Sequence, residues 1–308
     1  MLKRTVWKDY GSLLGLIGIG LVMSLLSNRF LTLTNLTNIA RQVSINAIIA
    51  MGMTLVIITG GIDLSVGSLV ALTGCLAIIA MGLPGADAVG ILVGLGVGAA
   101  AGAANGALIA YARIPPFIGT LAMLTMARGT ALVITDGQPI VRYESPYRWF
   151  GEGMIGGLPV PVLLMVFILG LTYFLLEHTP LGSYIYAVGG NEEAARLSGV
   201  KVRRIKSTVY LVSGLYAAIS GLILAGRLGS AQPNTGEGFE LDAIAAVVLG
   251  GTSLMGGKGS IWGTLIGAFI IGVLNNGFNL LNVSPFYQLI AKGAVIIFAV
   301  LVDQLLKR

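Results

Sequence analysis

The amino-acid sequence predicts an all-α protein, a polytopic membrane bundle of about ten transmembrane helices. Of its 308 residues, 56% are hydrophobic and 10% are charged, whereas about 25% of the residues of a soluble domain are charged. The mean hydropathy is +0.90. A helix needs roughly 20 apolar residues to cross the hydrocarbon core, and ten stretches approach that length. They lie near 11–27, 43–59, 66–83, 88–112, 118–136, 158–176, 207–226, 241–255, 260–281 and 286–303.

The distribution of charge orients these stretches in the membrane. Basic residues gather near both chain ends and in the loop from Glu177 to Ser207, and they mark the cytoplasmic side. We therefore expect one transmembrane domain over 1–308, with both termini and a loop at about 177–207 in the cytoplasm. The net charge is +6, and the basic residues lie at the ends of the spans. This placement favours a role in membrane orientation over nucleic-acid binding. Eight spans remain an alternative if two of the shorter apolar runs are re-entrant, which the glycine-rich segments around 60–67 and 250–259 would permit.

The cytoplasmic loop contains the pattern of a short helix, near Glu192 to Ser198. Asn191 is a suitable N-cap, Glu193 belongs to the first turn, and Gly199 ends the helix. Isolated helices need roughly 12 to 15 residues for stability in water, so this one is expected to dock against another surface. The residues alone leave two interpretations open, a docking element for a partner or a solvated connector.

Glycines are spaced to promote close helix packing. The stretch at 88–112 has a glycine at every fourth position, which gives one smooth helix face. These candidate packing residues are Gly90, Gly94, Gly98, Gly102 and Gly106. Two glycine-rich turns, GGIDLSVGS at 60–68 and GGTSLMGGKGS at 250–260, resemble each other and suggest an internal repeat. In the first turn, Asp63 or Ser65 is expected to cap the helix that follows.

Polar side chains within the apolar stretches are candidates for a translocation path. A charge at membrane depth is costly and faces a bundle interior, a cavity or the interface. Amides at that depth bind hydroxyl-rich solutes or neighbouring helices, and the long cations could also reach the interface. The candidate path residues are Asn46, Arg128, Asn275, Asn276 and Lys292.

The residues that membrane enzymes require are missing from the sequence. His178 is the only histidine and Cys75 the only cysteine, so Ser-His catalysis and His or Cys metal clusters are excluded. The segment TSLMGGKGS imitates a phosphate-binding loop but has Thr252 at its first glycine position and Gly259 after Lys258. We expect no catalytic residue, no metal and no cofactor. An ion-coupled transporter is a less favoured alternative, because Asp63 is the only acid expected near a span interior.

Three runs carry a family resemblance: ITGGIDLSVGSLVALTG at 58–74, AVGGNEEAARLSGVKVRRIK at 187–206 and ELDAIAAVVLGGTSLMGGKGSIWGTLIGA at 240–268. They resemble the permease subunits of bacterial ABC importers for monosaccharides, and the resemblance covers about Asn28 to Asp303. Within the family it is closest to permeases for D-ribose. Permeases for autoinducer-2, galactose and xylose have the same signatures, so those cargoes remain alternatives.

The resemblance implies a multi-pass protein of the bacterial inner membrane that translocates sugar by alternating access. Its implied partners are a second permease subunit, an ATPase subunit at the cytoplasmic face and an extracytoplasmic sugar-binding protein. It also implies that the short helix couples to the ATPase. The matching residues are Gly190, Asn191, Glu192, Glu193, Ala194, Ala195, Arg196, Leu197 and Ser198.

Overall fold

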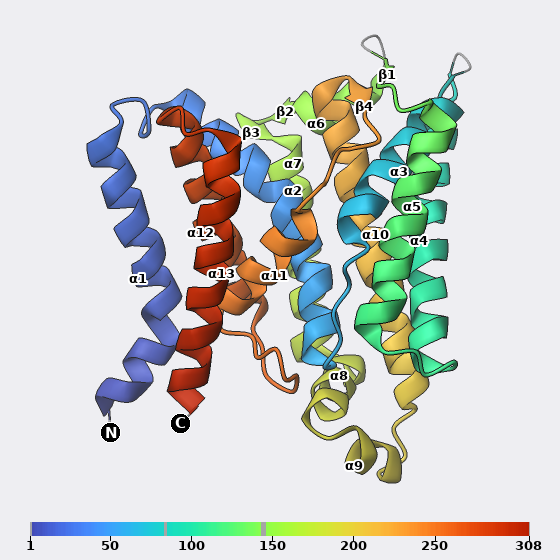
Figure 1. The fold of residues 1–308 in the computed structure, drawn as a ribbon, viewed down its shortest axis with the longest axis vertical. Helices are drawn as coiled ribbons and strands as arrows, with labels where there is room; N and C mark the ends of the chain where they lie inside the picture. The colour runs from blue at the N-terminus through green and yellow to red at the C-terminus, as the bar shows by residue number, and fades with distance from the viewer. Residues whose placement is uncertain (1, 83–84, 143–145, 308) are drawn as a thin grey trace.

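The computed structural model describes residues 2–82, 85–142 and 146–307 as a bundle of helices with a few two-residue strands (Figure 1). The α-helices are α1 Leu2–Leu26, α2 Leu33–Ile58, α3 Val66–Ala80, α4 Asp87–Ala110, α5 Pro116–Thr135, α6 Trp149–Glu152, α7 Val160–His178, α8 Pro180–Gly190, α9 Glu192–Leu197, α10 Val202–Leu228, α11 Phe239–Leu249, α12 Ile261–Leu280 and α13 Pro285–Lys307. A 3-10 turn, η1, covers Pro146–Arg148. The strands are β1 Ile140–Val141, which pairs with β4 Ser230–Ala231, and β2 Met154–Ile155, which pairs with β3 Leu158–Pro159.

Each of the ten predicted stretches overlaps one helix, but several boundaries differ. Helix α2 begins at Leu33, about ten residues before the predicted stretch. Thr32 is its N-cap and accepts a hydrogen bond from the Asn35 backbone N–H at 3.4 Å. Helix α11 ends at Leu249 rather than near 255, because Gly250 and Gly251 follow it and Gly251 has a φ of +84°. The hydropathy pattern missed about the first ten residues of α2 and put the end of α11 about six residues too late.

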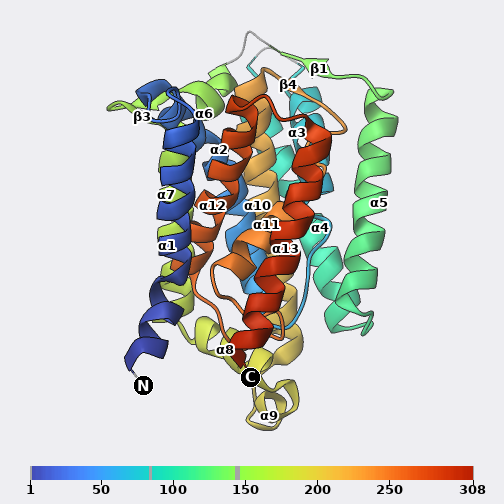
Figure 2. The same cartoon turned by 60° about the vertical axis from the view of Figure 1, so that its left-hand side comes forward.

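Helices α2 and α10 form the centre of the bundle. The most apolar window is 83% buried in α2 and 72% buried in α10, but only 22% buried in each of α4 and α5. Helix α10 packs along α4, α2 and α3. Helices α1 and α5 lie at opposite edges of the bundle (Figures 1 and 2). Within the described residues, six helices are long and apolar enough to cross a membrane: α2, α4, α5, α7, α10 and α12.

Helices α3 and α11 are short helices that begin inside the bundle. After α2, the chain runs back in extended form before α3 starts, and after α10 a second extended segment leads into α11 (Figure 1). The two starting points meet, because a Cβ on Gly67 would overlap the Gly236 carbonyl oxygen and the Glu240 carboxylate. The first turns of two oppositely directed helices therefore lie side by side within the bundle.

Hydrogen bonds around Asp63 fix the start of α3. The Asp63 carboxylate accepts hydrogen bonds from the Ser65 hydroxyl at 2.6 Å, the Ser65 backbone N–H at 3.1 Å and the Ser213 hydroxyl of α10 at 2.8 Å. Asn105 of α4 donates to the Ser65 hydroxyl at 2.9 Å. Ser65 is the N-cap residue but makes no side-chain cap bond. The Asp63 carboxylate therefore fixes the turn, and the Ser65 hydroxyl connects the turn to α4.

Candidate functional site

Helix α9 stands at the end of the bundle where both termini lie (Figures 1 and 2). The Asn191 side chain accepts a hydrogen bond from the Ala194 backbone N–H at 3.0 Å, and Gly199 has a φ of +86°. The helix therefore begins and ends as the sequence predicts. Leu197 is 77% exposed, whereas Ala195 is buried against the rest of the chain. Ala195 is thus unavailable to a partner, and the outward face carries charged residues and one leucine.

One ion pair lies within α9, and a second joins α9 to α10. Arg196 and Glu193 pair within the helix at 2.5 Å, and the Lys206 Nζ of α10 lies 2.6 Å from the Glu192 carboxylate. Hydrogen bonds from Arg196 lower the pKa of Glu193 below its ordinary value. The carboxylate therefore stays charged at neutral pH, and α9 presents a fixed pattern of charge.

Helix α8 connects α9 to the inner part of the bundle. A Cβ on Gly189, near the end of α8, would overlap the Ile58 carbonyl oxygen at the end of α2. That carbonyl accepts a hydrogen bond from the Gly257 backbone N–H at 2.9 Å, and the Tyr186 hydroxyl donates to the Gly259 carbonyl at 3.0 Å. The end of α2 and the glycine-rich turn at 250–260 therefore adjoin α8, and a displacement of α8 would reach both directly.

The glycine stripe of α4 faces α10 and the end of α3. A Cβ on Gly98 would lie 2.5 Å from both the Ala218 Cβ and the Gly214 carbonyl oxygen. A Cβ on Gly106 would lie 2.7 Å from the Ser207 Cα. Gly94 and Gly102 also contact α10, and Gly90 contacts Met81 and Ala77. The α4 backbone thus approaches its neighbours at a distance that a larger residue would prevent.

Lys292 and Asn275, two of the predicted path residues, meet at one carboxylate. Lys292 Nζ lies 3.0 Å from Asp242 Oδ2, and Asn275 Nδ2 donates to the same oxygen at 3.4 Å. Asp242 is buried, while the Lys292 side chain is 27% exposed. The enclosed Oδ1 of Asn275 has no hydrogen-bond donor in the described part of the chain. This cluster joins α11, α12 and α13.

The other predicted path residues are spread through the bundle. Arg128 of α5 donates hydrogen bonds to the carbonyl oxygens of Pro233 and Thr235, the latter at 2.9 Å. Asn276 exchanges two amide hydrogen bonds with Asn35 of α2, at 2.9 and 3.0 Å. Asn46 is half-buried on α2. The five residues therefore do not line one surface, and Arg128 and Asn276 have evident structural roles.

The acid that neutralises Lys292 is Asp242, which was not predicted. Asp63 was expected to be the only acid near a span interior, and this is wrong because Asp242 is buried in the first turn of α11. Asp242 falls within the predicted stretch 241–255. A charged residue inside one span needs a partner of opposite charge, so the sequence did contain a signal that could have paired Asp242 with Lys292.

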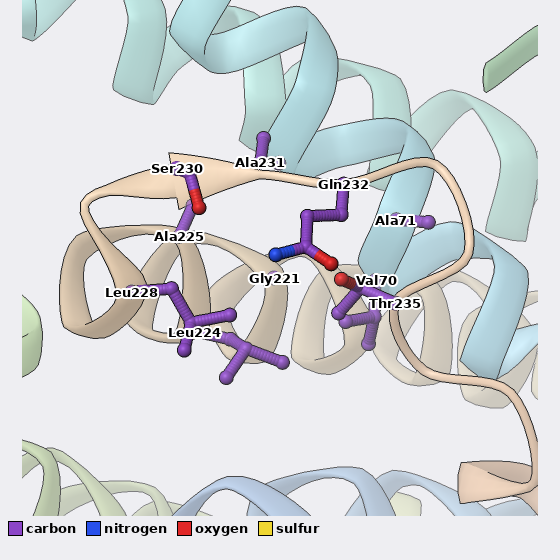
Figure 3. Close-up of a pocket in the computed structure, with 11 residues that line it drawn as sticks. Val70, Ala71, Gly221, Leu224, Ala225, Leu228, Ser230, Ala231, Gln232 and Thr235 are labelled. Carbon is purple, nitrogen blue, oxygen red and sulfur yellow. The ribbon is translucent and has the colours of Figure 1, made fainter. Parts of the chain in front are cut away.

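A small pocket opens at the end of the bundle opposite α9, beside the segment between α10 and α11 (Figures 1 and 3). It is a shallow, half-open depression, and its empty space of about 190 Å³ includes open solvent. Val70, Ala71 and Gly74 of α3 form one wall, and α10 forms another with Gly221, Leu224, Ala225 and Leu228. The extended segment contributes Ser230, Ala231, Gln232 and Thr235. The pocket thus combines two apolar helix walls with one polar edge.

Comparison with known proteins agrees with a membrane permease. The ribose import permease protein RbsC of Bacillus subtilis strain 168 is 53% identical over 302 residues, covering 97% of this chain and 94% of the relative. RbsC of Escherichia coli strain K12 is 52% identical over 296 residues, covering 95% and 92%. The D-allose transport system permease protein AlsC of the same strain is 39% identical over 305 residues, covering 98% and 93%.

No solved structure matches the chain. Residues 35–300 match the family described as branched-chain amino acid transport system, permease component. That range includes most of the helical bundle, α9 and the pocket. The chain therefore belongs to this family of membrane permeases.

Proposed function

We propose that this chain is the transmembrane permease subunit of an ATP-driven ABC importer for D-ribose in the bacterial inner membrane. The cargo rests on the high identity to ribose permeases over nearly the whole chain. ATP hydrolysis belongs to a separate subunit. The observation that carries the mechanism is the position of α9, a charged, outward-facing helix that α8 connects to the centre of the bundle.

The proposed orientation puts α9 and both termini in the cytoplasm. Helix α9 and the first turn of α10 carry Arg196, Arg203 and Arg204. Positive charge favours the cytoplasmic side of the membrane. Ten membrane segments then run in alternating directions, and two of them, α3 and α11, are short. The others are α1, α2, α4, α5, α7, α10, α12 and α13. Residues 1–308 form a single domain, and the loop at about 177–207 carries the contacts with the ATPase.

Coupling passes from α9 to the helices through backbone contacts. The ATPase subunit binds the exposed residues between Gly190 and Ser198, and its closure displaces α9 and α8. Gly189 transmits this displacement to Ile58 of α2 and to Gly257 of the α11–α12 turn, because no side chain separates these backbones. The glycine face of α4 lets α10 shift against it during the change from outward-open to inward-open states.

The sugar passes along a path completed by a second permease subunit, proposed to be a copy of this chain, after an extracytoplasmic binding protein delivers it. Asn46, Asn275 and Lys292 have polar atoms that a passing hydroxyl could use. Arg128 and Asn276 instead fix the elements that border the path, through their bonds to Pro233, Thr235 and Asn35.

Competition in reconstituted vesicles tests the cargo. Vesicles contain the permease with its co-purifying ATPase and binding protein, and uptake of labelled D-ribose is measured in the presence of unlabelled sugars. Unlabelled D-ribose should suppress uptake at the lowest concentration, with allose, galactose and xylose much weaker. Stronger suppression by another sugar would transfer the assignment to that sugar.

A further inference from the structure

Four exposed cations lie at the start of α10 and in the turn between α4 and α5, at the end of the bundle that carries α9 (Figures 1 and 2). In the part of the chain that the structure describes, none of the four forms an ion pair. The acids closest to α10 in the chain, Glu192 and Glu193, already pair with other cations. We call these four residues the basic patch: Arg113, Lys201, Arg203 and Arg204.

Close packing of α4 against α10 brings the two parts of the basic patch together. The Ser207 hydroxyl of α10 donates to the Gly106 carbonyl of α4 at 3.3 Å. One turn nearer the start of α10, the Arg203 guanidinium lies over the Tyr111 ring, with its Cζ 5.9 Å from the ring centroid. A cation over a ring face is attracted by the ring quadrupole. Arg203 is therefore held beside the turn that carries Arg113.

Arg113 has a backbone conformation that an arginine disfavours. Its φ is +58°, in the left-handed region where glycine, asparagine and aspartate are usual. The other non-glycine residues with positive φ in the described chain are Asp136 and Asn282. The Ile114 backbone N–H donates to the Leu108 carbonyl at 3.1 Å, which closes the end of α4 in a way that normally uses glycine. The chain thus carries a strained arginine where its charge joins the basic patch.

The helices themselves do not neutralise the basic patch. The end of α4 attracts Arg113, but the start of α10 is the positive end of a helix dipole and disfavours the other three cations. Helix α10 also has no acidic residue in its first turn. A bound anion would remove this repulsion.

The surface beside the basic patch indicates which anion fits. Tyr111 is 54% exposed, and Phe117 and Ile118 in the first turn of α5 are each 57% exposed. An apolar surface that ends at a group of cations matches a phospholipid, because acyl chains cover the apolar side chains and arginine binds the phosphate. A soluble anion would leave the apolar side chains uncovered.

We propose that the basic patch binds the phosphate headgroup of an anionic phospholipid of the cytoplasmic leaflet. Arg113 and Arg203 contact the phosphate, and Phe117 and Ile118 lie against an acyl chain. The choice of leaflet rests on the proposed function, which puts the α9 end in the cytoplasm. The bound lipid neutralises both sides of the contact between α4 and α10 and holds these two helix ends together.

Native mass spectrometry of the full-length permease in detergent, titrated with dioleoylphosphatidylglycerol, tests the site. Dioleoylphosphatidylcholine, which has no net charge, is the comparison lipid and should bind more weakly. Arg203→Gln should raise the phosphatidylglycerol concentration for half occupancy roughly 5-fold, the effect of losing one cation near a membrane surface. The matched control is Lys258→Gln, which removes an exposed cation from the α11–α12 turn, outside the basic patch, and should leave binding unchanged.

Arg113→Gly separates lipid binding from folding. Glycine removes the cation and adopts a φ of +58° without strain. The apparent Tm of lipid-free protein in detergent should therefore be unchanged or higher, while phosphatidylglycerol affinity falls roughly 5-fold. Wild-type affinity in both Arg113→Gly and Arg203→Gln, or equal binding of the two lipids by the wild-type permease, would overturn the proposal. Displacement of the bound lipid by inorganic phosphate would assign the patch to a soluble anion instead.

The ATPase subunit is the competing partner for the basic patch. Arg203→Gln protein that binds phosphatidylglycerol like the wild type but recovers less ATPase would assign the patch to the ATPase and overturn the lipid site. Lipid binding is measured on the permease alone, so it can fail while ATP-driven ribose uptake is intact. Selective phosphatidylglycerol binding by a permease that takes up no ribose would instead remove the cargo assignment and keep the lipid site.

Discussion

Asp242 and Lys292 are the clearest case of a single contact that organises the bundle. The carboxylate is buried, so removing its cation leaves an uncompensated charge. We expect Lys292→Met to destabilise the protein by about 3 kcal/mol, near the lower end for breaking a buried ion pair. Thermal unfolding in detergent should show a lower apparent Tm.

The double variant Asp242→Asn with Lys292→Met is the control for this pair. It removes both charges, so its apparent Tm should recover most of the loss. A double variant as unstable as Lys292→Met alone would mean that packing around the lysine stem, rather than charge, holds α13 to α11.

Arg128 and Lys292 also show how far residue-level prediction reaches. A cation within an apolar stretch must find a partner, and that requirement is readable from the sequence. The partners themselves are not readable in this way, because Arg128 bonds a carbonyl 107 positions away and Lys292 pairs with an acid 50 positions away. Only the packing of the helices brings such groups together.

At the scale of elements, the glycine stripe gives a prediction with an internal control. Gly98→Leu should lower stability in detergent, because its Cβ would lie 2.5 Å from Ala218 and from the Gly214 carbonyl. Overpacking of this kind costs roughly 1–3 kcal/mol or more. Gly96→Leu makes the same change two residues away, on another face of the helix, where a Cβ meets nothing within 4 Å. Its melting profile should match that of the unmodified protein. Equal losses would refute the close-approach interpretation.

Helix α9 gives a second prediction at this scale. Glu193→Arg puts two arginines at i and i+3 and reverses the charge of the outward face. We expect less ATPase to co-purify, with an unchanged size-exclusion profile of the permease. Glu152→Arg breaks the comparable Arg148–Glu152 pair at the opposite end and should leave co-purification intact. Full ATPase recovery with Glu193→Arg would argue that α9 is a solvated connector.

The elements differ in how well hydropathy and capping anticipate them. Asn191, Glu192 and Gly199 specify α9 through local chemistry alone, so its bounds are readable to within a residue. The starting points of α3 and α11 are not, because Asp63, Gly67 and Gly236 act through contacts between distant segments. Apolar runs also cannot distinguish a helix that crosses the whole bundle from one that begins inside it.

For the whole molecule, the arrangement connects two ends with different chemistry. One end carries α9 and both termini, and the other carries the pocket and the β1–β4 pair (Figure 1). Between them, α2 and α10 are the most buried of the six long apolar helices, and each contacts α8. Motion of α8 therefore has a continuous packed route toward the segment that lines the pocket.

The central claim is that this chain couples sugar movement to ATP consumed by another subunit. The most direct measurement is accumulation of labelled D-ribose in vesicles reconstituted with the permease and binding protein, with and without the ATPase subunit and ATP. Accumulation above the external concentration should require both the ATPase and ATP. Uphill accumulation by vesicles that contain neither would contradict the account.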